Sequence, residues 1–509
     1  MISGKIAGRI GLILGPILFL IVIFFPIPQI DELPFEARVV LASTLWMASW
    51  WITEAIPIYV TALLPLVIFP SLSVTDIEET SANYADSIIF LFLGGFLLAK
   101  AVEKSNLHRR LAYTILKIFG TDPKFIVAAF MVVTWLLGAW ISNTAITILM
   151  LPIALAVISL VDDVKKQSKF VICLLLSVAY SASISGVTTL IGTPPNAIFA
   201  SLANSLTGID VTFGQWLLMG LPISGISLVV AWLYMIRFGS KITDIKLDII
   251  GERDIIAEKL SELGPLSRDE KIVTAVFIIT VAAWISRGLL WKDILPAIDD
   301  STIAIASAIF LFLLPSSISK KNKEGRKDNA NLYKQIKDNQ INGNGIDKKS
   351  KILDWDTAVR IPWGVLILIG GGLALASAFT STGLGEWIAE KISFLGNTNY
   401  LIIILVFVTL AILPTEMISN TATAALLIPI AASFASSMDL NPILFMAPVA
   451  VATSYGFIMP VGTPPNAIVF SSGYITAGQM ARAGLPLDFI SIAMVTLLTS
   501  VFVPLVFGI

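Results

Sequence analysis

The sequence has few of the side chains on which most enzymes depend. Its 509 residues include one cysteine, Cys173, and one histidine, His108. One thiol cannot form a disulfide within the chain, and one of each residue is too few for a Cys/His metal cluster and gives little support to a Cys–His nucleophile pair or a catalytic triad. Cys173 lies in an apolar run, which favours a packed core thiol. His108 lies beside Arg109 and Arg110, which favours an interfacial residue over a ligand. The sequence therefore indicates a protein that is not an enzyme.

Charged residues are also scarce. They make up 14% of the chain, against about 25% in soluble domains, while 56% of the residues are hydrophobic. A soluble fold could not bury this much apolar surface, because even large domains need a polar exterior. The formal net charge of −1 offers no electrostatic footprint for nucleic acid. We therefore predict a multi-pass protein of the plasma membrane whose surroundings are the lipid bilayer.

Long apolar runs predict the membrane-spanning helices of an all-α polytopic protein. Eleven runs are long enough, or nearly so, to cross a bilayer: 7–25, 38–53, 56–72, 87–102, 170–204, 212–237, 271–290, 301–315, 361–380, 443–470 and 485–508. The first run has no small-residue cleavage site and is interpreted as a retained helix rather than a signal peptide.

Two further apolar stretches, 124–160 and 399–437, are each nearly twice as long as one spanning helix and contain a polar Ser-Asn-Thr in the middle. This pattern predicts re-entrant hairpins, in which two half-helices meet at a polar tip. Such a tip is tolerated at membrane depth only where protein or a water-filled cavity surrounds it. The sequence thus predicts eleven transmembrane helices and two hairpins.

The placement of lysine and arginine predicts the orientation. With the N-terminus inside and the C-terminus outside, the inside segments 104–124, 165–169 and 320–360 are rich in basic residues. The outside segments 31–36 and 76–86 carry acidic residues instead. This distribution agrees with the positive-inside rule.

The chain is predicted to divide into four parts. Residues 1–37 form the first helix and an external loop, 38–240 a first repeat, 241–270 a cytoplasmic connector and 271–509 a second repeat. The second repeat includes residues 316–358, which are rich in Lys and Asn and predict a solvated cytoplasmic loop.

The internal repeat is the strongest pattern in the chain. Ile141-Ser-Asn-Thr-Ala recurs as Ile418-Ser-Asn-Thr-Ala, and Gly192-Thr-Pro-Pro-Asn-Ala-Ile recurs as Gly462-Thr-Pro-Pro-Asn-Ala-Ile. A Gly-Gly pair precedes each Ser-Asn-Thr by the same 48 positions, and Gly-Gln followed by Gly-Leu-Pro comes after each Pro-Pro motif. Four matched landmarks in one order predict a duplicated unit.

Each predicted repeat has an odd number of crossings, so the two copies should lie upside down relative to each other. Inverted repeats are typical of secondary transporters, whose binding site lies near the midplane where helices are interrupted. Tandem prolines follow Thr193 and Thr463 inside the runs 170–204 and 443–470. Because they remove two backbone donors and clash with the preceding turn, each run is predicted to be a broken helix.

The predicted breaks offer neutral polar groups. Ser, Asn and Thr side chains can donate and accept hydrogen bonds, and half-helix N-termini favour an anion. Neither motif contains lysine or arginine, so a buried dianion would need co-bound cations to offset its desolvation. These residues predict a transporter that binds sodium ions together with a small dianion.

Two glutamates lie near these segments. Glu416 lies at membrane depth in the second hairpin, which makes it a functional candidate. It has no acidic counterpart in the first hairpin, so it is interpreted as an orienting or proton-sensing residue. Glu54 lies at a span boundary, where a structural role at the interface is favoured.

The doubled Ser-Asn-Thr, the doubled Gly-Thr-Pro-Pro-Asn and the segment Trp51-Ile-Thr-Glu-Ala-Ile-Pro resemble the divalent anion:sodium symporter family of dicarboxylate, citrate and sulfate carriers. The resemblance extends from about Trp46 to the C-terminus, apart from 316–358. It implies a homodimer of eleven spans with two opposed hairpins. It also implies an elevator motion, in which a transport domain carrying the hairpins and broken helices slides against a fixed scaffold.

The resemblance also assigns site residues. One sodium ion would be held by Ser142, Asn143 and the Gly192 backbone, and the other by Thr415, Ser419, Asn420 and the Gly462 backbone. Substrate carboxylates would contact Asn143, Thr144, Asn420, Thr421, Thr463 and Pro464. Family members often have a serine four positions before the first Ser-Asn-Thr. Here that position is Gly138, which offers only its carbonyl and would weaken the first cation site.

Sodium-coupled symport of a dicarboxylate such as succinate or malate is the function favoured by the two intact triplets. The alternatives are a sodium-independent dicarboxylate exchanger and a symporter of sulfate, a tricarboxylate or another divalent anion. A channel and an intramembrane enzyme are less favoured. The sequence leaves the anion, the sodium stoichiometry and the role of the 316–358 loop open.

Overall fold

The chain folds into packed α-helices. The computed structural model describes residues 2–28, 30, 32–118, 122–159, 164–239, 242, 252–292, 294–317, 350–391 and 398–509. Among these residues the β-structure is limited to an isolated bridge between Pro315 and Lys351, which confirms the predicted all-α class. The elements of the first half are α1 (Ile2–Phe24), α2 (Phe35–Thr53), α3 (Ile58–Thr61), α4 (Leu64–Ser71), α5 (Ile77–Ala82), η1 (Asn83–Ala85), α6 (Ser87–Lys104), α7 (Leu107–Ile118), α8 (Pro123–Gly138), α9 (Asn143–Ile158), α10 (Val164–Ser185), α11 (Pro194–Thr207), α12 (Phe213–Tyr234) and η2 (Met235–Gly239).

The second half continues the helical pattern. Its elements are α13 (Glu252–Glu262), α14 (Arg268–Ser286), η3 (Arg287–Trp291), α15 (Asp300–Leu313), α18 (Trp355–Ala358), α19 (Trp363–Ser381), α20 (Leu384–Lys391), α21 (Tyr400–Thr415), α22 (Asn420–Ser437), α23 (Ile443–Ala452), α24 (Pro464–Ser471) and α25 (Ala477–Phe507). Of the predicted cytoplasmic segments 241–270 and 316–358, residues 241, 243–251 and 318–349 lie outside the described residues.

Several helices suit a membrane. Within the described residues, five helical segments are long and apolar enough to cross one, including the region of α6 and the helices α12, α19 and α25. The predicted span 56–72 differs, because it divides into α3 and α4. Pro65 explains the division, since a proline ring clashes with the carbonyl four residues earlier, and α3 ends at that residue, Thr61.

Both predicted hairpins are pairs of short helices around a Ser-Asn-Thr. α8 and α9 enclose the first motif, and α21 and α22 enclose the second. Three of these helices have 16 residues and α22 has 18. At 1.5 Å per residue each extends roughly 24–27 Å, which is less than the hydrocarbon thickness of about 30 Å. These lengths suit helices that enter a membrane without fully crossing it.

The runs 170–204 and 443–470 are each divided between two helices. Residues 186–193, named the first interruption loop, separate α10 from α11, and residues 453–463, the second interruption loop, separate α23 from α24. The tandem prolines occupy the first two positions of α11 and α24. Proline is favoured there because those positions lack an intrahelical partner for their N–H groups. The helix therefore breaks just before each Pro-Pro.

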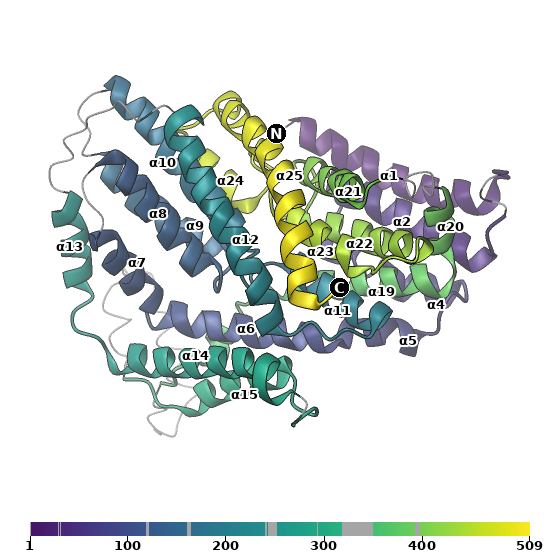
Figure 1. Ribbon diagram of the computed structural model, residues 1–509, viewed down its shortest axis with the longest axis horizontal. Coiled ribbons are helices and arrows are strands. Elements are labelled where there is room, and N and C mark those ends of the chain that lie inside the picture. The colour runs from purple at the N-terminus through teal and green to yellow at the C-terminus, as the bar shows by residue number, and fades with distance from the viewer. Residues whose placement is uncertain are drawn as a thin grey trace, which may run out of the picture.

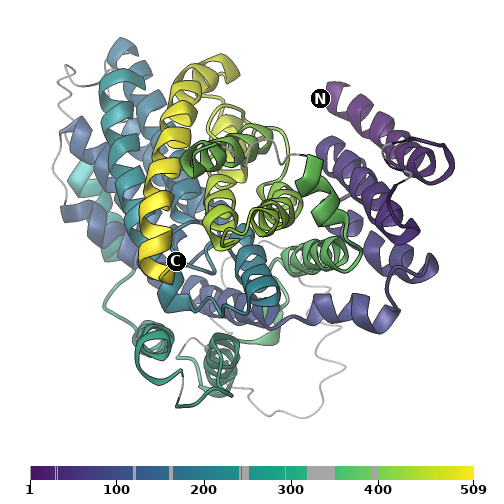
Figure 2. The same ribbon diagram turned by 45° about the vertical axis from the view of Figure 1, so that its right-hand side comes forward.

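Each hairpin contacts the broken helices of both repeats. α8 and α9 pack on α10, and α21 and α22 pack on α23. Across the repeats, α9 contacts α24 while α22 contacts α11. Figures 1 and 2 show the first hairpin and α12 on one flank, α1 and α2 on the opposite flank, and the second repeat's α22, α23 and α25 between them. The two repeats thus interlock through their hairpins.

Charged contacts lie on the side of the predicted cytoplasmic segments. Lys104 at the end of α6 donates to the Lys351 carbonyl and to the Asp354 carboxylate, both at 2.7 Å. Arg110 in α7 pairs with Glu270 at 2.6 Å. Partial burial alone would raise the pKa of Asp354, but the hydrogen bonds from Lys104 and Thr357 outweigh it and hold that pKa at about 2. These contacts hold residues 351–354 against α6 and the start of α14 against α7.

Candidate functional site

The Ser-Asn-Thr motifs begin the second helix of each hairpin. Ser142 is the N-cap of α9, and its Oγ accepts a hydrogen bond from Ala145 N at 3.3 Å. Ser419 is the N-cap of α22 but makes no capping bond through its side chain. The Oδ1 atoms of Asn143 and Asn420 are buried and have no hydrogen-bond partner among the described residues. Buried acceptors are normally satisfied, so these two amide oxygens are available to a ligand.

An asparagine in each second half-helix holds the adjacent interruption loop. Asn196 Nδ2 donates to the carbonyls of Gly186 and Thr189, both at 2.9 Å. Asn466 makes the same two bonds to the equivalent carbonyls of the second loop, at 3.2 and 3.1 Å. Because the amide nitrogen makes two hydrogen bonds, the Oδ1 atom is directed away from these carbonyls. In both asparagines this oxygen is buried and has no partner within the part of the chain that the structure describes. The repeat in sequence is therefore also a repeat in hydrogen bonding.

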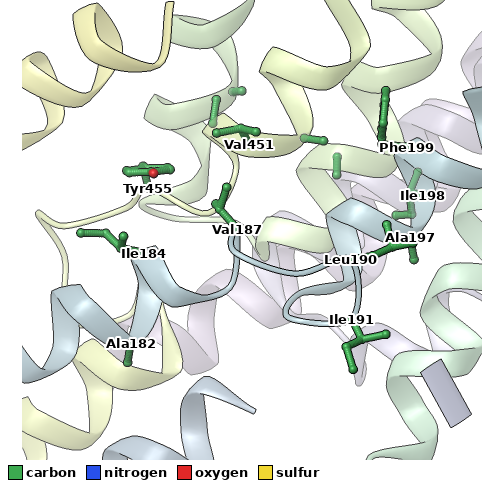
Figure 3. Close-up of a cluster of buried hydrophobic side chains, with 14 of the residues drawn as sticks. Ala182, Ile184, Val187, Leu190, Ile191, Ala197, Ile198, Phe199, Val451 and Tyr455 are labelled. Atoms are coloured by element: carbon green, nitrogen blue, oxygen red, sulfur yellow. The ribbon is translucent and has the colours of Figure 1, made fainter. Parts of the chain in front are cut away.

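The end of α10 and the first interruption loop pack against the second interruption loop. Tyr180 in α10 donates its hydroxyl to the Phe457 carbonyl at 3.1 Å, with ring centroids 4.9 Å apart. Ser183 donates to Thr463 Oγ1 at 3.4 Å. Figure 3 shows Val187 of the first loop in one buried cluster with Tyr455 of the second repeat. The motif-bearing breaks of both repeats therefore lie in one region of the molecule.

Each hairpin tip touches the interruption loop of its own repeat. A Cβ added to Gly186 would lie 3.3 Å from Asn143 Nδ2, and one added to Gly456 would lie 3.3 Å from Thr415 Oγ1. A Cβ on Gly192 would approach the Gly186 carbonyl oxygen to 2.5 Å. Only glycine fits at this position, because the obstacle is backbone.

Glu416 joins the second hairpin tip to the second interruption loop. Its carboxylate, 5% exposed, accepts hydrogen bonds from Ile458 N at 3.0 and 3.1 Å and from Met459 N at 2.7 Å. The first repeat makes a neutral link at the same place, where Thr189 Oγ1 donates to the Ala139 carbonyl at 2.6 Å. The geometry suits the orienting role expected of Glu416.

The remaining predicted residues lie around these contacts. Thr463 is buried, and its Oγ1 accepts from Asn466 N at 3.3 Å. Thr421 is also buried, whereas Thr144 and Pro464 are exposed. Gly462 lies against the Glu416 carboxylate, since an added Cβ would be 3.1 Å from Oε2.

Three polar residues of this region received no role in the sequence analysis. Asn196 and Asn466 lie inside the repeated Gly-Thr-Pro-Pro-Asn-Ala-Ile motif, so their duplication was a usable signal. Asp488 lies in the apolar run 485–508 and is 1% exposed. A carboxylate in such a run is a functional candidate by default, so the position of Asp488 in the sequence was sufficient to single it out.

The electrostatics of the region suit an anion accompanied by cations. Segments 139–145, 186–196 and 453–466 contain no lysine, arginine or histidine. Segment 415–421 adds one charged residue, the acid Glu416. An anion would therefore meet hydroxyls, amides and helix N-termini but no basic side chain in these segments. The unpartnered oxygens of Asn143 and Asn420 are hard ligands that suit an alkali cation, so the residues present fit sodium.

A separate cavity of about 250 Å³ lies between η1, α11 and α19. Its lining includes Asp86, Ser201 and Ser377, and Ser201 Oγ donates to Asp86 Oδ2 at 2.8 Å. Its lining contains none of the predicted site residues. The candidate site is therefore the region of the hairpin tips and interruption loops, where the repeated motifs lie.

Comparison with known proteins identifies the family. The family model described as the sodium:sulfate symporter transmembrane region matches residues 10–509. The sodium-dependent dicarboxylate transporter SdcS of Staphylococcus aureus (strain bovine RF122 / ET3-1) is 40% identical over 513 residues, covering 99% of this chain and 93% of that protein. The transporter of the same name from Staphylococcus saprophyticus is 40% identical over 516 residues, covering 100% and 93%.

A solved structure agrees with the fold. The crystal structure of the YdaH transporter of Alcanivorax borkumensis matches 92% of this chain and 98% of its own, with a TM-score of 0.54 and 12% sequence identity. This likeness concerns the fold alone. The family model and the two relatives carry the assignment: the chain belongs to the divalent anion:sodium symporter family and is a multi-pass membrane transporter rather than an enzyme.

Proposed function

We propose that the protein is a sodium-coupled symporter of dicarboxylates such as succinate or malate. The observation that carries the proposal is the duplicated site at the hairpin tips and interruption loops, which contains no lysine, arginine or histidine. In this site the amide oxygens of Asn143 and Asn420 have no partner among the described residues. The relatives named sodium-dependent dicarboxylate transporters, at 40% identity over nearly the whole chain, support the same substrate class.

In this proposal the two hairpin tips hold the cations. Ser142, Asn143 and the Gly192 backbone bind one sodium ion, and Thr415, Ser419, Asn420 and the Gly462 backbone bind another. The dicarboxylate is held by Asn143, Thr144, Asn420, Thr421, Thr463 and Pro464, next to the N-termini of α9, α22, α11 and α24. The cations offset the desolvation of the dianion, so substrate binds well only after sodium. That order couples the two fluxes.

The proposal also includes the architecture. Eleven spans and two re-entrant hairpins form inverted repeats over 38–240 and 271–509, with the N-terminus inside and the C-terminus outside. Residues 1–37 add the first helix and an external loop, and 241–270 a cytoplasmic connector. The hairpins and broken helices move together as an elevator against a scaffold that dimerises. The contacts of α9 with α24 and of α22 with α11 support a single moving body, because they tie the two halves of the site together.

The test is uptake of radiolabelled succinate into proteoliposomes with a sodium or a choline gradient. We expect uptake against a concentration gradient with sodium only, since each tenfold sodium gradient contributes about 1.4 kcal/mol per ion. Asn143→Ala and Asn420→Ala should each reduce uptake at least about tenfold, the cost of losing one hydrogen bond to a charged group. Asn204→Ala is the matched control, because Asn204 is exposed on α11 away from the motifs.

Each alternative predicts a different result in the same assay. A sodium-independent exchanger would need internal dicarboxylate instead of external sodium, and a channel would not accumulate succinate at all. Competition by succinate, malate, citrate and sulfate ranks the anions, and preferential inhibition by sulfate would contradict the dicarboxylate assignment. Normal uptake in both asparagine variants would contradict the site.

A further inference from the structure

The cavity outside the candidate site lies where α19 packs against both α11 and η1. Its volume is about 250 Å³, whereas a cavity of about 150 Å³ is enough to hold benzene. The lining combines polar side chains with apolar ones, and it includes Asn83, Asp86, Ser201, Ser377, Leu206 and Leu373. The space therefore suits a small organic molecule, somewhat larger than benzene, that has both a polar and an apolar part.

Asp86 gives this cavity a negative charge. Its Oδ1 accepts a hydrogen bond from Ile88 N and its Oδ2 accepts one from Ser201 Oγ, both at 2.8 Å. A carboxylate has about four acceptor positions, so both oxygens can accept further hydrogen bonds. Among the described residues, no lysine, arginine or histidine lines the cavity, and none of them forms an ion pair with Asp86. The charge of this half-buried carboxylate is therefore available to a cationic ligand.

The chemistry of the lining selects the class of cation. An anion such as the transported dicarboxylate would be repelled by Asp86 and would find no basic side chain. A bare alkali ion is far smaller than the cavity, and Leu206 and Leu373 offer it no ligand atoms. A primary ammonium group carries one positive charge and donates three hydrogen bonds, which match the carboxylate and hydroxyl oxygens. A hydrocarbon body attached to it would pack on the leucines, so the cavity favours a small organic ammonium ion.

The cavity also lies on the boundary between the two parts that the proposed elevator separates. α11 is half of a broken helix and moves, whereas η1, α6 and α19 belong to neither a hairpin nor a broken helix and stay with the scaffold. The hydrogen bond from Ser201 in α11 to Asp86 at the start of α6 crosses this boundary. A ligand that contacts both sides must leave before the two parts slide past each other. Its binding would therefore slow transport without touching the motif residues.

We propose that this cavity is a regulatory site, which binds a small organic ammonium ion through Asp86 and thereby slows transport. The effect on transport rests on the proposed function, because it needs the elevator motion, whereas binding itself does not. The same ammonium chemistry occurs in soluble amines and in the ethanolamine headgroup of lipids. The experiment separates these two sources.

The probe is phenethylammonium, and the control ligand is 2-phenylethanol, which has nearly the same shape but no charge. Binding is measured by calorimetry on the purified protein in detergent, and inhibition by sodium-driven succinate uptake into proteoliposomes. We expect phenethylammonium to bind and to reduce uptake even at saturating succinate. 2-Phenylethanol should bind at least about tenfold more weakly, because it lacks the hydrogen bond between charged groups.

Asp86→Asn removes the charge but keeps an acceptor for Ile88 N, since asparagine is also a favoured helix N-cap. The variant should retain sodium-driven uptake and bind phenethylammonium at least about tenfold more weakly. Asp76→Asn is the matched control, because Asp76 caps α5 through a bond from Glu79 N at 2.7 Å and does not line the cavity. It should bind the probe like the wild type. Ser377→Leu, which fills part of the cavity, should also weaken binding and replaces Asp86→Asn if that variant does not fold.

The outcomes separate this inference from the function on which its second half rests. Absence of phenethylammonium binding to the wild type would overturn the site and leave the symporter intact, as would equal binding to the wild type and to the Asp86 and Ser377 variants. Binding without inhibition would overturn the regulatory role. Asp86-dependent binding in a protein that takes up succinate without sodium would refute the symporter but keep the site.

The lipid composition of the liposomes identifies the source of the ammonium group. Uptake is compared in liposomes of phosphatidylcholine and phosphatidylglycerol, with and without phosphatidylethanolamine. A several-fold weaker inhibition by phenethylammonium when phosphatidylethanolamine is present would show that the lipid headgroup competes for the cavity. Unchanged inhibition would assign the cavity to a soluble amine.

Discussion

At the scale of single residues, asparagine has two different structural roles in this protein. Asn143 and Asn420 present buried oxygens without a partner at the hairpin tips. Asn196 and Asn466 use their nitrogens to hold the interruption loops. An amide suits both tasks, because it donates and accepts without carrying a charge into the membrane. The loop asparagines therefore position the backbone around the ligands.

Replacing Asn196 with alanine should damage the protein itself. The change removes two hydrogen bonds and leaves the buried carbonyls of Gly186 and Thr189 unsatisfied, which costs about 2–4 kcal/mol. We expect an apparent unfolding temperature several degrees lower in detergent, together with loss of succinate uptake. Asn204→Ala on the same helix should change neither. An unaltered melting curve for Asn196→Ala would argue against the loop-holding role.

At the scale of elements, a glycine lies at the point where each of the long helices α12 and α25 packs against an interruption loop. A Cβ on Gly220 would lie 2.3 Å from the Val187 carbonyl oxygen, and one on Gly484 would lie 2.0 Å from that of Phe457. Both glycines come from the matched Gly-Leu-Pro. Backbone atoms obstruct these positions, so no rotamer change can relieve a larger residue. The helices can approach the loops only because the side chain is absent.

Gly484→Ala should therefore displace the second interruption loop. Because Phe457 N in that loop also donates a hydrogen bond to Asp488 Oδ1, at 3.2 Å, we expect loss of most uptake and a destabilisation of about 1–3 kcal/mol, typical of overpacking. Gly478→Ala is the matched control, since nothing lies within 4 Å of its Cβ position, and it should transport normally. Uptake in the two variants at equal protein density checks this, and equal activity in both would contradict the close packing.

At the scale of the whole molecule, the repeats depend on each other. The first hairpin contacts α24 and the second contacts α11, so neither repeat could complete its half of the site alone. Tyr180 and Ser183 add direct bonds from α10 to the second repeat. Ligands that bind between these parts should hold the whole assembly together.

Sodium and succinate should consequently stabilise the protein jointly. A ligand present at about 100 times its dissociation constant stabilises the native state by about 2.7 kcal/mol. We expect succinate to raise the apparent unfolding temperature in sodium buffer but to change it little in potassium or choline buffer. Propionate, a monocarboxylate, is the control ligand. An equal shift by succinate without sodium would refute the binding order and favour the exchanger.

Some features followed from local sequence because their causes are local. Proline acts on its own turn and the four residues before it, so Pro194 and Pro464 predicted the breaks. Ser142 and Ser419 are N-caps in the structure, at tips that a polar triplet in an apolar stretch already indicated. Pro65 likewise indicates a helix break, but the hydropathy of the run 56–72 is continuous and by itself predicts one span.

What the sequence by itself determined is the membrane class, the duplication and the positions of the four breaks, since composition, repeats and proline chemistry are properties of the chain. The tertiary structure decided which breaks meet. It brought the Asn196 amide to the first interruption loop and Asp488 to the second, and it paired each hairpin with the other repeat's broken helix. Such contacts join residues far apart in the chain, and they are selected by packing and by the need to satisfy buried polar groups, which no local pattern encodes.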